Sequence, residues 1–157
     1  MHPRRLSVSH LNLNGENNLS EYLRPDMGFE LRKISALGLA HVGDAVFELM
    51  IRTWLCTSGT ATAKALHGGA VSFASAKAQA AAFQRIKPFL TEQEFEVYKR
   101  GRNAQVNSVP RNASHSEYHT ATGLESLIGH LYLSGQEERL DELFELIIAD
   151  TEKLDDE

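Results

Sequence analysis

The chain has 157 residues, a length that suits one domain, and its 42% apolar residues are enough to form a hydrophobic core. Its single cysteine, Cys56, excludes an intramolecular disulfide framework and a cysteine-based zinc site, so we expect a reducing, cytoplasmic location. No apolar run approaches the ~18 residues that a membrane-spanning helix needs, and the net charge of −5 at first argues against nucleic acid as a partner.

The first half of the chain is predicted to form an irregular arm followed by helices. Residues 1–30 are rich in asparagine and carry residues typical of turns rather than a periodic pattern. Apolar residues recur at helical spacing over 36–55, and a second helix is expected over 61–68. The alanine-rich stretch 70–86 predicts a third helix, which Pro88 ends.

The second half predicts three more helices. Thr91, with Glu94 three residues later, forms a capping-box pattern, and the helix that begins there is expected to end at Gly101. A polar loop over 102–117 follows, and apolar periodicity predicts the last two helices over 118–134 and 138–153. The sequence therefore predicts an all-α fold of about seven helices, without a strand or an internal repeat.

Charge is unevenly distributed along this predicted fold. No acid lies between Val97 and Ser116, whereas the chain from Glu137 onward is crowded with acids. We divide the chain into the arm 1–30, one domain over 31–150 and an acidic tail over 151–157. The basic stretch is either a nucleic-acid contact or an ordinary solvated face.

Two carboxylates stand out because they interrupt apolar helices. Asp44 follows Gly43, and a charge in such surroundings is costly unless it is paired, hydrogen-bonded or metal-bound. Asp44 could instead face solvent or pair with Arg52, and Glu48 lies one turn further on the same side. Glu125 is a second lone carboxylate, and the same alternatives apply to it.

Mid-helix glycines suggest how these two carboxylates could meet. Gly43 and Gly129 each cost about 1 kcal/mol relative to alanine, and such glycines often mark close contact between helix backbones. If the two helices cross there, Asp44 and Glu125 could share one cation. Magnesium takes one or two protein carboxylates and keeps positions open for water and phosphate, which suits phosphodiester hydrolysis.

Several blocks of the sequence resemble a known family. Residues 39–48 (LAHVGDAVFE) resemble the signature helix of ribonuclease III catalytic domains, and residues 124–133 (LESLIGHLYL) resemble that family's second acidic helix. Residues 73–80 (FASAKAQA) and 99–104 (KRGRNA) resemble the short form of the family, Mini-ribonuclease III. The resemblance covers about residues 34–148, with the blocks in the right order and spacing.

This resemblance implies a homodimer with a ribonuclease III catalytic fold that cleaves double-stranded RNA and leaves 5′-phosphate and 3′-hydroxyl ends. It implies Mg²⁺ as cofactor, and Asp44 and Glu125 as catalytic and metal-binding residues. The expected substrate is precursor 23S ribosomal RNA, cut at a terminal stem that a ribosomal protein can present. The expected RNA-binding residues are Lys77, Lys99, Arg100, Arg102, Asn103 and Arg111.

The sequence also departs from the full-length relatives. They carry acids at two positions that are Ala40 and Thr122 here, which puts a second tightly held metal ion in doubt and leaves Glu48 as a possible substitute. One alternative is therefore a catalytically silent RNA-binding or ribosome-associated dimer on the same fold. Another is a helical protein-interaction module that uses the acidic tail.

Overall fold

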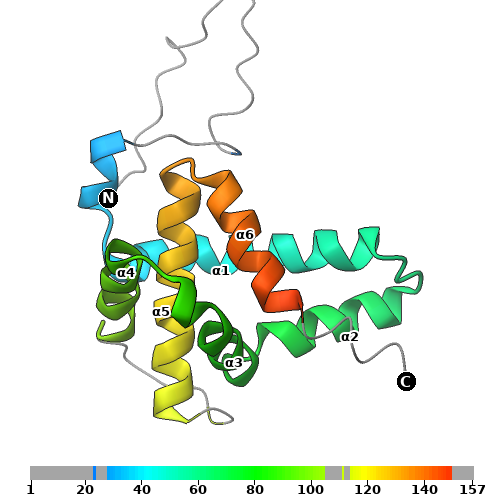
Figure 1. Ribbon diagram of the computed structural model, residues 1–157. Helices are drawn as coiled ribbons and strands as arrows, with labels where there is room; N and C mark the ends of the chain where they lie inside the picture. The colour runs from blue at the N-terminus through cyan, green and yellow to red at the C-terminus, as the bar shows by residue number, and fades with distance from the viewer. Residues whose placement is uncertain (1–22, 24–27, 105–110, 112–113, 150–157) are drawn as a thin grey trace, which may run out of the picture.

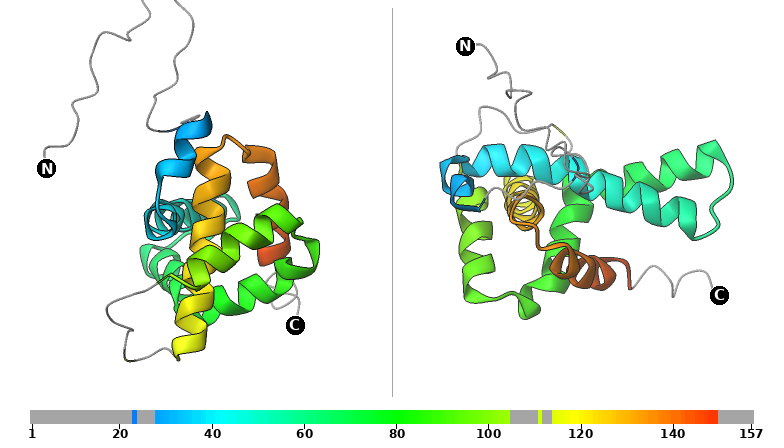
Figure 2. Two further views of the ribbon diagram at one scale, coloured as in Figure 1. Left: turned by 90° about the vertical axis from the view of Figure 1, so that its left-hand side faces the viewer. Right: turned by 90° about the horizontal axis from the view of Figure 1, so that it is seen from above.

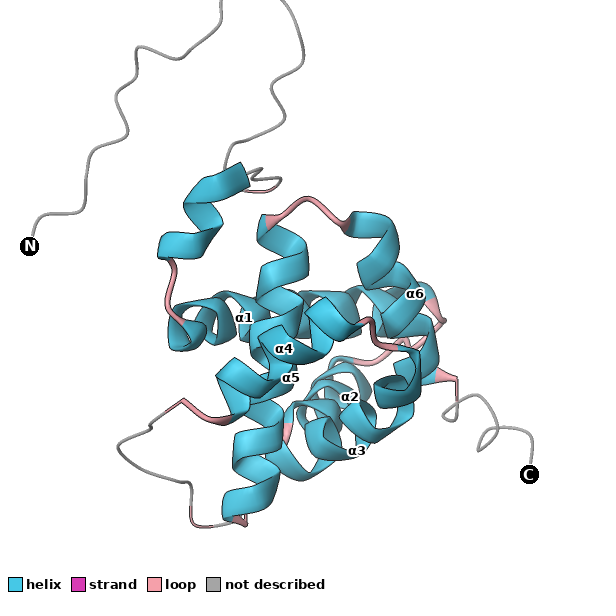
Figure 3. Ribbon diagram, turned by 60° about the vertical axis from the view of Figure 1, so that its left-hand side comes forward, coloured by secondary structure: helices cyan, strands magenta, loops and turns pink. Residues whose placement is uncertain are grey.

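The computed structural model describes residues 23, 28–104, 111 and 114–149, and every regular element in these ranges is helical (Figure 3). This confirms the all-α prediction for the described part of the chain, and none of its helices is long and apolar enough to cross a lipid bilayer. The elements are η2 (Gly28–Lys33), α1 (Ala36–Thr57), α2 (Ala63–Ala74), α3 (Ala76–Ile86), η3 (Lys87–Phe89), α4 (Glu92–Arg102), α5 (His115–Leu133) and α6 (Glu137–Ile148).

The centre of the fold is α5, against which α1, α3, α4 and α6 pack (Figure 1). Helix α1 crosses it, α3 and α4 pack against it, and α6 turns back to pack against α5 and α3. The α5 side chains of Leu124, Leu127 and Leu131 are fully buried. The second half of α1 extends beyond the bundle with α2 running back alongside it (Figure 2).

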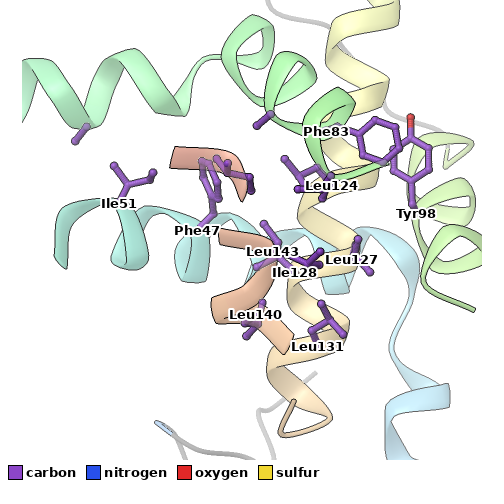
Figure 4. Close-up of a cluster of buried hydrophobic side chains, with 14 of the residues drawn as sticks. Phe47, Ile51, Phe83, Tyr98, Leu124, Leu127, Ile128, Leu131, Leu140 and Leu143 are labelled. Carbon is purple, nitrogen blue, oxygen red and sulfur yellow. The ribbon is translucent and has the colours of Figure 1, made fainter. Parts of the chain in front are cut away.

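The main hydrophobic core joins five helices around α5 (Figure 4). Phe47 and Ile51 come from α1, and α6 contributes Leu140, Leu143 and Ile147. At the other side of α5, the rings of Phe83 from α3 and Tyr98 from α4 stack with their centroids 3.7 Å apart. This packing fixes α5 against both α3 and α1, the two helices that meet at Glu125.

Several predicted boundaries differ from the structure, and three of them have an identifiable cause. The stretch 70–86 is two helices, because Ser75 has an extended backbone and its hydroxyl accepts a hydrogen bond from the Ala78 amide as an N-cap. Gly101 lies inside α4 rather than at its end, where the absence of a side chain leaves room for Ser126 of α5. Helix α5 begins at His115 because Ser114 and Glu117 form a capping box that the sequence analysis missed.

Other features of the sequence analysis agree with the structure. The capping box of Thr91 and Glu94 is present, and Gly135, with a φ of 72°, follows the end of α5. The predicted arm lies outside the described residues, except for Leu23 and the part from Gly28, which belongs to η2. The acidic tail 151–157 lies outside them entirely.

An ion pair between Arg139 and Glu94 ties α6 to the start of α4. The guanidinium Nε and Nη2 atoms donate to the two Glu94 carboxylate oxygens at 2.9 and 3.0 Å, and Nη2 also donates to the Phe89 carbonyl. The hydrogen bonds from Arg139 hold the pKa of Glu94 below its ordinary value. The pair therefore stabilises the fold above the ordinary carboxyl pKa range, and its contribution is lost as the pH falls below that range.

We expect Arg139→Ala to lower the free energy of unfolding by about 2–3 kcal/mol at pH 7. The range for breaking a buried ion pair is about 3–5 kcal/mol, and the value here is lower because a quarter of the Arg139 side chain is exposed. Urea unfolding at pH 7 checks this. The control is Glu142→Gln, which removes only the exposed partner of Arg139 and should cost under about 1 kcal/mol. Equal losses of unfolding free energy in Arg139→Ala and Glu142→Gln would contradict the stabilising role of the ion pair between Arg139 and Glu94.

Candidate active site

The site is built on the crossing of α1 and α5, where two glycines face each other. A Cβ on Gly43 would lie far inside van der Waals contact of the Glu125 carbonyl oxygen and 2.7 Å from the Gly129 nitrogen. A Cβ on Gly129 would lie 2.8 Å from the Leu39 carbonyl carbon. The two helices therefore meet backbone to backbone, which confirms the predicted crossing and excludes any side chain at either position.

The crossing brings the two predicted carboxylates together. Asp44 follows Gly43 on the exposed side of α1, and Glu125 is half-buried on α5. Burial and the nearby Asp44 carboxylate raise the pKa of Glu125 to about 7, so the two acids are close enough to repel each other. Ser126 stabilises the crossing, because its buried hydroxyl donates a 2.8 Å hydrogen bond to the Ala36 carbonyl at the start of α1.

The other acidic candidate, Glu48, is engaged elsewhere. It forms an exposed ion pair with Arg52, one turn along the same helix, so the alternative pairing of Asp44 with Arg52 is not what the structure shows. Ala40 is buried, and the Thr122 hydroxyl donates to the Tyr118 carbonyl at 3.1 Å. Within the described residues, no group of three or more His, Cys, Asp and Glu side chains could hold a metal ion.

Asp44 and Glu125 fit one hard divalent cation. Two oxygen-donor carboxylates from separate helices suit Mg²⁺, which needs few protein ligands. The repulsion between the carboxylates that raises the pKa of Glu125 is what a bound cation would relieve, because it favours both ionised forms. An exposed Asp44 also leaves one side of such a site open to substrate.

The burial of Glu125, together with its repulsion by Asp44, predicts that Glu125→Gln stabilises the protein at alkaline pH when a chelator removes metal ions. The pKa of Glu125 is raised in the folded state, so folding favours its protonated form and the wild type loses stability as the pH rises from about 4.5 through 7. Glutamine removes this loss, a gain of up to about 3 kcal/mol at pH 8 that vanishes near pH 4. Urea unfolding with a chelator at both pH values checks this. A gain in stability that is the same at pH 8 and pH 4 would contradict this prediction. The control is Glu145→Gln, which changes an exposed residue of α6.

The predicted RNA-binding residues lie at the surface, on α3, on and just after α4, and at Arg111. Lys77 is exposed in the first turn of α3, and Arg111 is exposed between the undescribed stretches 105–110 and 112–113. Lys99 is 35% exposed, pairs with Glu96 at 2.5 Å and lies over the Phe95 ring. The predicted polar loop falls largely outside the described residues.

Two clefts lie beside α4 and divide the remaining basic residues between them. Arg102 and Asn103 line a cleft of about 610 Å³, which Lys87 and His119 also line. Arg100 lines another of about 560 Å³, together with Arg32 and His130. Burial and the Arg100 guanidinium lower the pKa of His130, so its neutral form is favoured. Among the described residues, no acid lines either cleft, so both suit anionic groups.

The sequence analysis missed the polar residue that contacts the acid pair. Gln79 is only 1% exposed, and its side-chain amide lies beside Glu125 and lowers the pKa of that carboxyl, opposing burial and Asp44. Its only signal in the sequence was a single uncharged polar side chain among the alanines of 76–82. Lys87, His119 and His130, which line the clefts, were also missed.

Comparisons with known proteins agree with the resemblance of the sequence blocks. The Ribonuclease III domain family model matches residues 37–136, which include both carboxylates. The chain is 41% identical over 120 residues to Mini-ribonuclease 3 of Clostridium tetani, covering 76% of this chain and 80% of that protein. It is 44% identical over 116 residues to Mini-ribonuclease 3 of Enterococcus faecalis, covering 73% and 88% of the two chains.

The fold has a counterpart among solved structures. A crystal structure of a protein from Fusobacterium nucleatum matches with a TM-score of 0.71 and 31% sequence identity, covering 78% of this chain and 98% of the other. The matched family model, the identity to relatives over most of their length and the shared fold therefore agree. The chain belongs to the ribonuclease III family of endoribonucleases, where it groups with Mini-ribonuclease III.

Proposed function

We propose that the chain is a magnesium-dependent endoribonuclease that cleaves double-stranded RNA and leaves 5′-phosphate and 3′-hydroxyl ends. The observation that carries this proposal is the glycine crossing of α1 and α5, which brings Asp44 and Glu125 together. Two carboxylates on one open site suit phosphodiester hydrolysis. The name shared by the relatives, Mini-ribonuclease 3, gives the reaction class.

In this mechanism the carboxylates of Asp44 and Glu125 would bind and orient the divalent cation. The rigid helix crossing keeps the two side chains at fixed positions. Bound magnesium supplies positive charge at the scissile phosphate and a water of lowered pKa that can act as nucleophile. Asp44, on the exposed side, faces the substrate, and Glu125 completes the site from α5. The predicted RNA-binding residues, Lys77, Lys99, Arg100, Arg102, Asn103 and Arg111, contact phosphates and place the duplex, which requires no sequence readout.

We further propose that the enzyme works as a homodimer. One protomer has one carboxylate pair, and a two-fold axis would provide two pairs, one for each RNA strand. The proposed substrate is the terminal stem of precursor 23S ribosomal RNA in the cytoplasm, and a ribosomal protein that presents this stem is the proposed partner. The family resemblance is the support for substrate and partner.

A specific observation favours a second candidate, a catalytically silent RNA-binding dimer. The two positions where full-length relatives carry acids hold a buried alanine, Ala40, and a threonine, Thr122, whose hydroxyl is already hydrogen-bonded. Neither supplies a carboxylate for a metal ion. The silent protein would bind duplex RNA equally well with and without magnesium and would cut nothing.

The test is to incubate the protein with a long RNA duplex, the matched single strand and duplex DNA, each with Mg²⁺ and with a chelator. We expect magnesium-dependent cutting of the RNA duplex alone, with 5′-phosphate ends. The same assay on a precursor 23S stem tests the substrate. Binding of both RNA duplexes without cutting of either would overturn the enzyme proposal in favour of the silent binder.

A further inference from the structure

Gln79 stands out because its side-chain amide is buried without a completed hydrogen bond. Gln79 lies near the start of α3 and is 1% exposed, among the most deeply buried polar side chains of the described residues. Its Nε2 atom has no partner of standard hydrogen-bond geometry within the described part of the chain. A buried amide donor that is left unsatisfied destabilises the fold, so an apolar residue at this position would pack more favourably in the core.

The surroundings of Gln79 identify the group that its amide faces. Helix α3 packs against α5, and the Gln79 side chain is close enough to Glu125 to stabilise the ionised carboxylate. Within the described residues, the Nε2 atom of Gln79 makes no hydrogen bond of standard geometry, so this donor remains available to the Glu125 carboxylate.

A neutral donor suits this position because the site already holds excess negative charge. Asp44 and Glu125 repel each other, and no acid stands at Ala40 or Thr122 to orient them through a second ion. A third carboxylate would add to the repulsion, whereas an amide N–H fixes one carboxylate oxygen without adding charge. The other oxygen then remains directed at a cation that Asp44 shares.

We propose that Gln79 is a positioning residue of the active site, whose Nε2 donates to one oxygen of Glu125 and so presents the other oxygen to the divalent cation. The proposal rests on the proposed function, because it assumes that Asp44 and Glu125 hold a metal ion. Groups that orient metal ligands from behind typically contribute about 10–100-fold to metal affinity. The three helices α1, α3 and α5 would each contribute one side chain to the site.

The main test replaces the amide by an apolar side chain of similar length, Gln79→Met, and measures Mn²⁺ affinity by calorimetry in the RNA-free protein. We expect affinity about tenfold weaker or more, with thermal stability unchanged or higher because the unsatisfied amide is gone. The Mg²⁺ concentration at half-maximal single-turnover cleavage should rise by a similar factor, while the KM for RNA at saturating Mg²⁺ stays unchanged. The matched control is Gln84→Leu, an exposed glutamine on the same helix, which should leave metal affinity unchanged.

A double-mutant cycle separates positioning from a merely structural role. If Gln79 acts through Glu125, adding Gln79→Met to a Glu125→Gln protein should change the residual metal affinity by less than twofold. Gln79→Asn keeps the amide but shortens its reach by one methylene, so it should also weaken binding, and it replaces the methionine variant if that protein does not fold.

The results that would overturn the role of Gln79 differ from the results that would overturn the proposed function. If the wild type binds no divalent cation and cuts no duplex, the proposed function fails and this proposal fails with it. If the wild type binds and cuts, but Gln79→Met or Gln79→Asn binds Mn²⁺ within twofold of it, only the role of Gln79 is overturned. If Gln79→Met lowered the metal affinity as much in the Glu125→Gln protein as in the wild type, the role of Gln79 would also be overturned.

Discussion

Replacing Asp44 by asparagine should abolish cleavage of duplex RNA, with single-turnover rates at least about a thousandfold lower at saturating substrate. The substitution keeps the size of the side chain but removes one of the two charges that hold the cation, and the cation's electrostatic stabilisation of the transition state is worth several kcal/mol. Glu125→Gln should have a comparable effect, since α5 offers no other acid at the crossing. The measurement is single-turnover cleavage of an end-labelled RNA duplex.

The matched control is Glu48→Gln on the same helix. Glu48 is paired with Arg52 on the exposed side of α1, so its loss should change the cleavage rate less than about threefold. Far-UV circular dichroism and light scattering establish that each variant is folded and in the same assembly state as the wild type. Rates within tenfold of wild type in a folded Asp44→Asn protein would contradict the role of the carboxylate pair.

A second large effect is expected at the helix crossing, where Gly43→Ala and Gly129→Ala should each destabilise the fold by about 3 kcal/mol. Alanine is ordinarily the better helix residue, but here its methyl group would collide with backbone atoms of the partner helix rather than with a flexible side chain. The helices would have to separate, lowering Tm by about 10 °C and moving Asp44 away from Glu125. The Tm and the metal affinity should therefore decrease together.

Gly68 provides the control for this prediction. It also lies within a helix, α2, but a Cβ there would meet nothing within 4 Å. Gly68→Ala should therefore stabilise the protein by up to about 1 kcal/mol, the ordinary helix preference. If Gly43→Ala gave the same gain as Gly68→Ala, the close crossing of α1 and α5 would be refuted.

The features that could be predicted from the sequence depend on local patterns. Apolar periodicity found the helices on either side of the crossing, and the two mid-helix glycines predicted their close contact, because a costly glycine in a helix needs a packing reason. Asp44 and Glu125 were identifiable as charges in apolar helices. Their proximity then followed from the crossing, which the structure confirms.

The remaining features depend on tertiary contacts that no local pattern reports. Gly101 looks like a helix end, yet it continues α4 because Ser126 of α5 packs where a side chain would stand. Gln79 has the sequence pattern of an exposed polar residue among alanines, and only the packing of α3 on α5 buries it beside Glu125. Arg100 and Arg102 are neighbours in sequence but line different clefts, since the helical turn points them apart.

We propose that the crossing of α1 and α5 creates one divalent-cation site from Asp44 and Glu125. A crystal of the wild-type protein grown with Mn²⁺, measured at the manganese absorption edge, tests it most directly. The account predicts an anomalous peak between the two carboxylates, about 2 Å from an oxygen of each, with the Gln79 amide hydrogen-bonded to Glu125. Ordered Asp44 and Glu125 side chains with no peak between them at saturating Mn²⁺ would contradict it.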